Sequence, residues 1–169
     1  MIHLVIPNTS HKSDYLDCIK KWAEAEKTPI SPNNFFYGNS YEEFLEYTEK
    51  SRMYPEEGRV PATLFFAYDD DVLVGALDLR HHIDHEFLAE IGGHIGYGVA
   101  PKYRRKGYAT KILAKGLEEA KKLGLKKVLV SCDDENIGSK KVIEKNGGVF
   151  ERYTNWNGKK ISRYQIDLS

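Results

Sequence analysis

The chain has 169 residues, of which 41% are hydrophobic and 30% are charged, an ordinary length and composition for one globular domain. Its 25 Lys and Arg residues balance its 25 Asp and Glu residues, so no overall positive field draws the chain to nucleic acid or to an anionic membrane. We therefore expect a single domain over residues 1–169 that has neither of these partners.

The first third of the chain predicts one strand, two helices and a long irregular segment. Residues 2–6 alternate as a short strand, and residues 12–26 place apolar side chains at helical spacing. The stretch 27–61 is rich in proline and glycine, with one further helix expected over residues 41–50. We expect this irregular stretch to form a lid or a wall of the substrate site.

From residue 62 onward the pattern alternates between strands and helices. We expect strands over residues 63–68, 72–79, about 90–99 and 127–132, helices over 108–123 and 139–146, and a terminal hairpin over 149–156 and 159–168. This order predicts a fold of the α/β class in the broad sense (α+β). It should contain a mixed, mostly antiparallel sheet of about six to seven strands with helices on both faces.

The sharpest chemical signal is a basic loop between the strand that ends at residue 99 and the helix that begins at residue 108. Four basic residues crowd it, and a helix N-terminus offers unpaired N–H groups and positive dipole charge to phosphate oxygens. Gly107 and the small Ala109 allow a close approach. A solvated basic loop is the alternative. The loop has neither the P-loop spacing nor the three-glycine dinucleotide fingerprint, so a different phosphate ligand is indicated.

The motif Arg104-x-x-Gly107-x-Ala109 resembles that of the GNAT superfamily of N-acetyltransferases. The resemblance extends over residues 62–151 and implies acetyl-CoA as cosubstrate, with the pantetheine arm along residues 96–99 and the pyrophosphate on backbone amides of residues 104–110. It implies the following cofactor-binding residues: Tyr97, Gly98, Val99, Arg104, Arg105, Lys106, Gly107, Tyr108, Ala109 and Thr110.

A second element of the resemblance is an Asn after the next strand, followed by a helix. Asn136 matches it and would face the CoA arm, and Ser139 could contact that arm. Taken alone, Asn136 would be read as a helix N-cap.

Catalytic residues are less clearly marked. Many members of the superfamily carry a tyrosine as general acid where this chain has Ile143, so Tyr97 is the tentative acid, with Tyr108 and Tyr153 as further candidates. The candidate bases are Glu90 and His94, because the attacking amine must lose a proton. For Glu90 the alternative is a surface charge on an edge strand, and for His94 it is a structural histidine. A backbone N–H near Val99 could hold the oxyanion.

We expect no metal site. The run His81-His82-Ile83-Asp84-His85-Glu86 has neither the His-Glu-x-x-His nor a zinc-finger spacing, and residues 133–135 are better read as a solvated loop. Two widely separated cysteines, Cys18 and Cys132, and an apolar start without a basic leader indicate a cytoplasmic protein.

The predicted activity is transfer of acetyl from acetyl-CoA to a primary amine of a small molecule, peptide or protein, by direct attack in a ternary complex. A non-catalytic acyl-CoA sensor or scaffold is the alternative. We expect residues 27–60 and 80–90 to border the acceptor and the terminal hairpin to be able to pair across a homodimer. The side chains expected to suit a cationic amine there are Phe35, Phe36, Tyr37, Glu42 and Glu43.

Overall fold

The computed structural model describes residues 1–26 and 31–169, and it contains a four-stranded and a three-stranded sheet. The larger sheet has the order β1 (Ile2–Val5), β2 (Ala62–Asp69), β3 (Val72–Arg80) and β4 (Ile95–Val99). The smaller sheet has the order β5 (Lys127–Asp133), β7 (Lys159–Asp167) and β6 (Val149–Trp156). Adjacent strands within each sheet are antiparallel.

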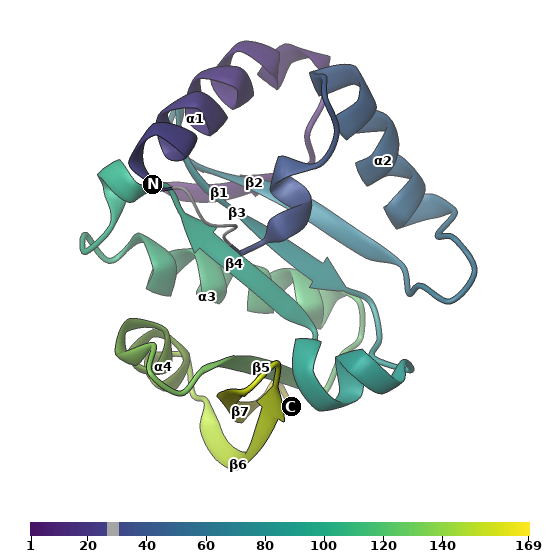
Figure 1. Ribbon diagram of the computed structural model, residues 1–169, viewed down its shortest axis with the longest axis vertical. Coiled ribbons are helices and arrows are strands. Elements are labelled where there is room, and N and C mark those ends of the chain that lie inside the picture. The colour runs from purple at the N-terminus through teal and green to yellow at the C-terminus, as the bar shows by residue number, and fades with distance from the viewer. Residues whose placement is uncertain (27–30) are drawn as a thin grey trace.

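The helices cover both faces of the larger sheet, as the sequence predicted (Figure 1). The helices α1 (Lys12–Ala25) and α2 (Tyr41–Met53) lie on one face, with a short 3₁₀ turn at Asn33–Phe36 between them. Opposite them runs α3 (Tyr108–Lys122), and α4 (Ile137–Lys145) lies beside the smaller sheet. None of the helices in the described ranges is long and apolar enough to cross a membrane.

Two hydrophobic cores follow from this layering. The stripe of α3 buries Ile112 and Leu113 against Leu77 of β3 and Val128 of β5, so one core joins the two sheets. The other core is aromatic and lies under α1 and α2. Its largest side chains are Tyr15, Trp22, Phe35, Phe44 and Phe66.

Local sequence accounts for the start of α2 and for the terminal turn. Ser40 caps α2 by accepting from the Glu43 N–H at 3.1 Å. The Asn157-Gly158 pair adopts the positive φ angles of 49° and 77° that a tight hairpin turn requires. The predicted segments agree with the observed strands and helices except for the one expected over residues 90–99.

That strand is shorter than predicted because residues 88–92 form a π-helical turn and β4 begins only at Ile95. The chain reverses at Gly93, whose φ is 65° and whose added Cβ would lie 2.5 Å from the Leu129 carbonyl oxygen. Glycine is therefore required where β4 meets β5. The expectation that Glu90 lies on a strand is wrong.

Candidate active site

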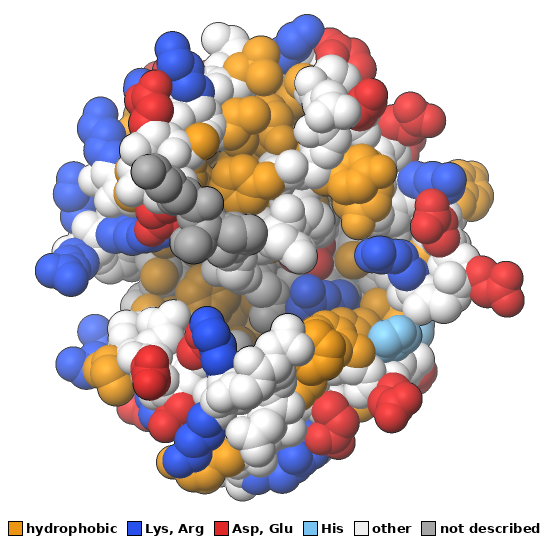
Figure 2. All heavy atoms as spheres, viewed as in Figure 1, with side chains coloured by type: hydrophobic (Ala, Val, Ile, Leu, Met, Phe, Trp, Pro, Cys, Tyr) orange, Lys and Arg blue, Asp and Glu red, His pale blue; other side chains and the backbone are white. Residues whose placement is uncertain are grey.

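The two sheets touch at one end of β4 and separate toward the other. His94 donates its backbone N–H to the Leu129 carbonyl at 2.8 Å, and its Nδ1 accepts from the Leu129 N–H at 2.9 Å. Beyond this contact the sheets enclose a cleft of about 870 Å³, lined by β4, β5, α4 and the loop before α3. Figure 2 shows the molecule hollowed between the half that holds α1 and α2 and the half that holds the smaller sheet.

The edge of β4 presents to this cleft backbone groups that β3 does not pair. Arg80 N–H bonds to the His94 carbonyl, and Ala100 N–H bonds to the Val74 carbonyl, each at 2.8 Å. In an antiparallel pair the bonded residues alternate, so the register turns the N–H and C=O groups of Tyr97 and Val99 away from β3. An extended ligand arm can therefore bond to this edge as an added strand would.

The loop before α3 forms an anion site from backbone. Gly107 has a φ of 82°, and nothing lies within 4 Å of a Cβ added to it, so the space beside it is open. The first bond inside α3 runs from Lys111 N–H to the Gly107 carbonyl at 3.4 Å. The three preceding amides, at residues 108–110, therefore have no acceptor within the helix and line the cleft. Such a terminus binds phosphate oxygens.

Arg104 differs from its predicted role. Its guanidinium forms an ion pair with Glu26 at the C-terminal end of α1 and donates from Nε to the Val99 carbonyl at 2.9 Å. Its amide donates to the Pro101 carbonyl at 3.2 Å. Because Glu26 neutralises the side chain and the amide is bonded, Arg104 holds the loop in place, and the predicted range of phosphate-binding amides narrows to residues 105–110.

Of the other basic residues, Arg105 lines the cleft, whereas Lys106 is not among the described residues that line it. The Lys106 ammonium lies 5.9 Å from the centre of the Tyr103 ring. The Lys106 side chain is therefore oriented toward an aromatic neighbour, and only its backbone amide stays in the predicted phosphate site.

Tyr97 and Ser139 meet across the cleft. Their hydroxyl oxygens are 2.6 Å apart, which joins β4 to α4. Burial raises the pKa of Tyr97 to about 12, so the phenol is protonated at neutral pH. Ile143 is completely buried in the core, so this position serves packing. A pair of hydroxyl groups thus borders the cleft.

Asn136 is a helix cap that also lines the cleft, and its contact with a CoA arm stays a prediction. Its Oδ1 accepts from the Ser139 N–H at 3.0 Å and caps α4, and the residue also lines the cleft. The cap fixes the first turn of α4 and, with it, the position of the Ser139 hydroxyl.

The two other candidate tyrosines have structural contacts. Tyr108 lines the cleft, but its hydroxyl donates to Asp69 Oδ2 at 2.7 Å, which raises its pKa and fixes the start of α3 to the end of β2. The Tyr153 ring is exposed on β6, with the Lys160 ammonium 3.7 Å from its centre. Neither hydroxyl is placed beside the edge of β4.

Both predicted bases occupy structural positions. Glu90 is exposed, forms an ion pair with Arg152 at 2.8 Å that lowers its pKa, and lines neither of the two large cavities of the described chain. His94 is buried, and desolvation lowers its pKa to about 4. Because its Nδ1 accepts from the Leu129 N–H, the structural reading of His94 is the one that the geometry supports.

A second cavity, of about 540 Å³, lies on the face of β3 that α2 covers. It is bordered by residues 33–34, by the end of α2 and the loop after it, and by residues 85–88, so it falls between the two segments expected to border an acceptor. Residues 27–30 of that expectation lie outside the described residues. The aromatic and acidic side chains named for it do not line the cavity within the described ranges, and Phe35 is buried in the core.

Sequence reasoning missed the charged side chains that line this cavity, namely Lys50, Glu56, Glu57, Arg59, Asp78 and Arg80. A signal was present: Asp78 is a lone carboxylate inside the apolar run of β3, and a buried carboxylate requires partners. The polar run over residues 81–86 forms a loop and the start of the next turn. No cluster of three or more metal-ligating side chains occurs among residues 1–26 and 31–169.

Residues 21–148 match the model of the Acetyltransferase (GNAT) family. An uncharacterized N-acetyltransferase of Bacillus subtilis (strain 168), YnaD, is 32% identical over 80 residues, which are 47% of this chain and 44% of that protein. The chain thus spans less than half the length of this relative.

Two solved structures share the fold. The putative acetyltransferase yncA from Salmonella typhimurium, solved with acetyl-CoA, superposes with a TM-score of 0.68 at 12% identity, covering 99% of this chain and 94% of that one. RimL, a ribosomal L7/L12 α-N-protein acetyltransferase solved with coenzyme A, gives a TM-score of 0.71 at 16% identity, with coverage of 99% and 94%.

Proposed function

The chain belongs to the acetyltransferase (GNAT) family, and from that premise we propose that it transfers an acetyl group from acetyl-CoA to a primary amine. The observation that carries the proposal is the cleft, which combines the free edge of β4 with the unpaired amides at the start of α3. These are the two features that a pantetheine arm and a pyrophosphate require.

The proposed position of the cofactor follows from these features. The pyrophosphate takes the amides of residues 105–110 beside Gly107, and the pantetheine arm bonds to the backbone of Tyr97 and Val99. Asn136 and Ser139 border the arm from α4. The thioester then lies where β4 and β5 separate, close to the Tyr97 hydroxyl.

The proposed reaction is a direct attack. The neutral amine nitrogen attacks the thioester carbon, a C–N bond forms, and the C–S bond then breaks. The oxyanion of the tetrahedral intermediate accepts from a backbone N–H of β4. Starting from an ammonium, one proton leaves to water or to a base before attack, and the second goes to the departing thiolate, so that amide, thiol and one free proton result.

Tyr97 is the proposed donor of the thiolate proton. Its high pKa keeps it protonated, and the Ser139 hydroxyl at 2.6 Å can relay a replacement proton. The pair thus performs at β4 and α4 the task that a tyrosine at position 143 would perform in relatives.

The test combines calorimetry with a thiol-release assay. Acetyl-CoA should bind to the purified protein, and free CoA should appear only when a primary amine is added. Tyr97→Phe should lower kcat by roughly 10²-fold or more, the usual effect of losing a general acid, with acetyl-CoA affinity unchanged. Binding without CoA release for any amine would contradict the proposed transfer.

We further propose a single cytoplasmic domain that can form a homodimer. Both cysteines are free thiols, which supports a reducing compartment. The outer strand β6 exposes Val149, Phe150, Tyr153 and Trp156, which supports pairing through the terminal hairpin. Light scattering measures the molecular mass of the chain and of a Phe150→Lys variant. A monomer mass of the unaltered chain at every concentration would contradict the proposed homodimer.

A further inference from the structure

The 540 Å³ cavity lies directly behind the strand that borders the cofactor cleft. Asp78 in the cavity wall is the register partner of Gly96, which lines the cleft. The Arg80 Nη2 atom would be 3.9 Å from a Cβ added to Gly96. The two cavities are therefore separated by one glycine of β4 and by the Ser31–Pro32 segment that lies over it.

Two buried acceptor atoms of this cavity have no donor. Asp78 is 4% exposed, and its Oδ1 makes no hydrogen bond in the described chain. The Asn34 Oδ1 is also buried without a partner there, and the residue lines the same cavity. Burial raises the pKa of the Asp78 carboxyl, and the nearby Arg80 and Asn34 offset this only in part, so a bound cation would favour its charged form. Buried acceptor oxygens in this state require a donor. A primary ammonium carries three N–H donors and a positive charge.

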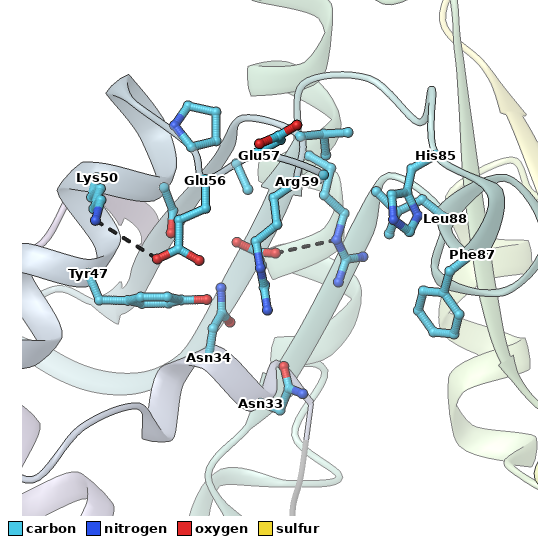
Figure 3. Close-up of a pocket in the computed structure, with 17 residues that line it drawn as sticks. Asn33, Asn34, Tyr47, Lys50, Glu56, Glu57, Arg59, His85, Phe87 and Leu88 are labelled. Atoms are coloured by element: carbon cyan, nitrogen blue, oxygen red, sulfur yellow. Dashed lines mark ion pairs between the residues drawn. The ribbon is translucent and has the colours of Figure 1, made fainter.

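The cationic side chains of the cavity differ in their ion-pair and hydrogen-bond partners. Arg80 lies 3.5 Å from Asp78 Oδ2 and donates to the Gly92 and Gly93 carbonyls. The Lys50 ammonium is 3.9 Å from Glu56. The Arg59 side chain, by contrast, has no ion pair or hydrogen bond among residues 1–26 and 31–169, and only its backbone N–H donates, to the Glu56 carbonyl at 3.0 Å. Figure 3 shows its side chain extending into the cavity toward Asn33 and Asn34. A free guanidinium is suited to bidentate binding of an oxyanion.

We propose that this cavity receives the acetyl acceptor and that the acceptor is a small primary amine that also carries an oxyanion. This inference rests on the proposed transferase function. The ammonium is held by Asp78 and Asn34, one strand from the thioester, and the oxyanion by Arg59. A carboxylate and a phosphonate share the required chemistry.

A polyamine is the competing acceptor. Arg59 and Arg80 would repel its second ammonium, whereas Glu56 and Glu57, which also line the cavity, would attract it. A neutral amide in place of the oxyanion would leave Arg59 without a partner. Acceptors that carry an amine but no oxyanion are therefore the informative comparison with amines that carry one.

The experiment measures CoA release by the full chain with matched acceptors. Four sets of acceptors are compared. Two carry an oxyanion: amino carboxylates with different spacing between the amine and the carboxylate, and aminoalkylphosphonates. Two carry none: the carboxamides of the same amino acids, and diamines of the same length. The best amino carboxylate or phosphonate should exceed its carboxamide in kcat/KM by about 10- to 100-fold, because a charged hydrogen-bonding pair is gained. The carboxylate and phosphonate arms identify the oxyanion.

The variants test the two assigned groups. Arg59→Gln should remove the preference for the oxyanion, whereas Arg52→Gln, which changes an arginine of α2 outside the cavity lining, should keep it. Asp78→Asn should raise the acceptor KM and leave the Kd of acetyl-CoA unchanged. The inference would be overturned if carboxamides or diamines reacted as well as the oxyanion-bearing amines. It would also be overturned if Arg59→Gln kept the preference for the oxyanion.

Failure of the function itself gives a different result. If acetyl-CoA does not bind, or binds and no amine of any arm releases CoA, the transferase proposal falls and the acceptor assignment falls with it. If diamines alone release CoA, the transferase stands and the oxyanion assignment is refuted.

Discussion

Substitution of Gly107 separates binding of the cofactor from stability of the fold. The residue has a φ of 82°, and nothing lies within 4 Å of an added Cβ. Gly107→Ala should therefore cost about 1–2 kcal/mol of unfolding free energy through left-handed strain alone. The added methyl group would occupy the space through which phosphate oxygens approach the amides of residues 108–110. Loss of one charge-assisted bond there corresponds to about 1.5–3 kcal/mol, or roughly a 10- to 100-fold rise in the Kd of acetyl-CoA.

Gly124, at the other end of α3, provides a matched control. Its φ is 85°, and its added Cβ also meets nothing within 4 Å. Gly124→Ala should therefore show the same loss of stability, about 2–8 °C in Tm for a chain of this size, with unchanged acetyl-CoA affinity. Calorimetric titration and thermal unfolding of both variants provide the comparison. Equal acetyl-CoA affinity in the two variants would refute the proposed position of the pyrophosphate.

The remaining predictions concern β4 and the turn before it. The unfolding free energy should fall by up to about 3 kcal/mol as pH falls from 6.5 to 4, because the unfolded state protonates His94 and the folded state does not. His94→Asn should flatten this dependence in urea titrations at several pH values. Glu90→Gln should leave the pH–rate profile unchanged and change the Tm little, because its ion pair is exposed; loss of the acidic limb of the profile, where a general base becomes protonated, would identify Glu90 as the base. Gly98→Ala should lower Tm and kcat/KM more than Gly96→Ala, because its Cβ would lie 1.8 Å from the Ser31 carbonyl oxygen, against 3.2 Å from the Ser31 Oγ at Gly96; equal effects would contradict this reading.

The sequence predicted the features that depend on local chemistry. Apolar spacing located α3, whose observed span is Tyr108–Lys122, and the Asn157-Gly158 pair located the terminal turn. Gly107 was identified as the loop residue that permits close approach, and its left-handed conformation agrees. Short-range rules are sufficient here because the backbone geometry depends on a few neighbouring residues.

Side-chain roles that depend on distant partners were not predictable in the same way. Arg104 is 78 positions from Glu26, and Glu90 is 62 positions from Arg152, yet each forms an ion pair across the fold. No local pattern shows that a basic residue of a phosphate loop is already neutralised. The place where the two sheets meet was equally hidden, because it depends on the contact between His94 and Leu129, which are 35 positions apart.

The alternation of β4 explains how one short strand can serve both cavities. Gly96 and Gly98 face Ser31 on the side of α1 and α2, whereas Tyr97 faces the opposite side and reaches Ser139. A side chain at either glycine would meet Ser31, which lies over the strand between the 540 Å³ cavity and the cleft. In the proposed arrangement the amine therefore reaches the thioester past Gly96, and the leaving thiolate takes its proton from Tyr97 on the other face. The glycines at positions 96 and 98 leave room for Ser31 on the first face, and Tyr97 between them places its hydroxyl on the second.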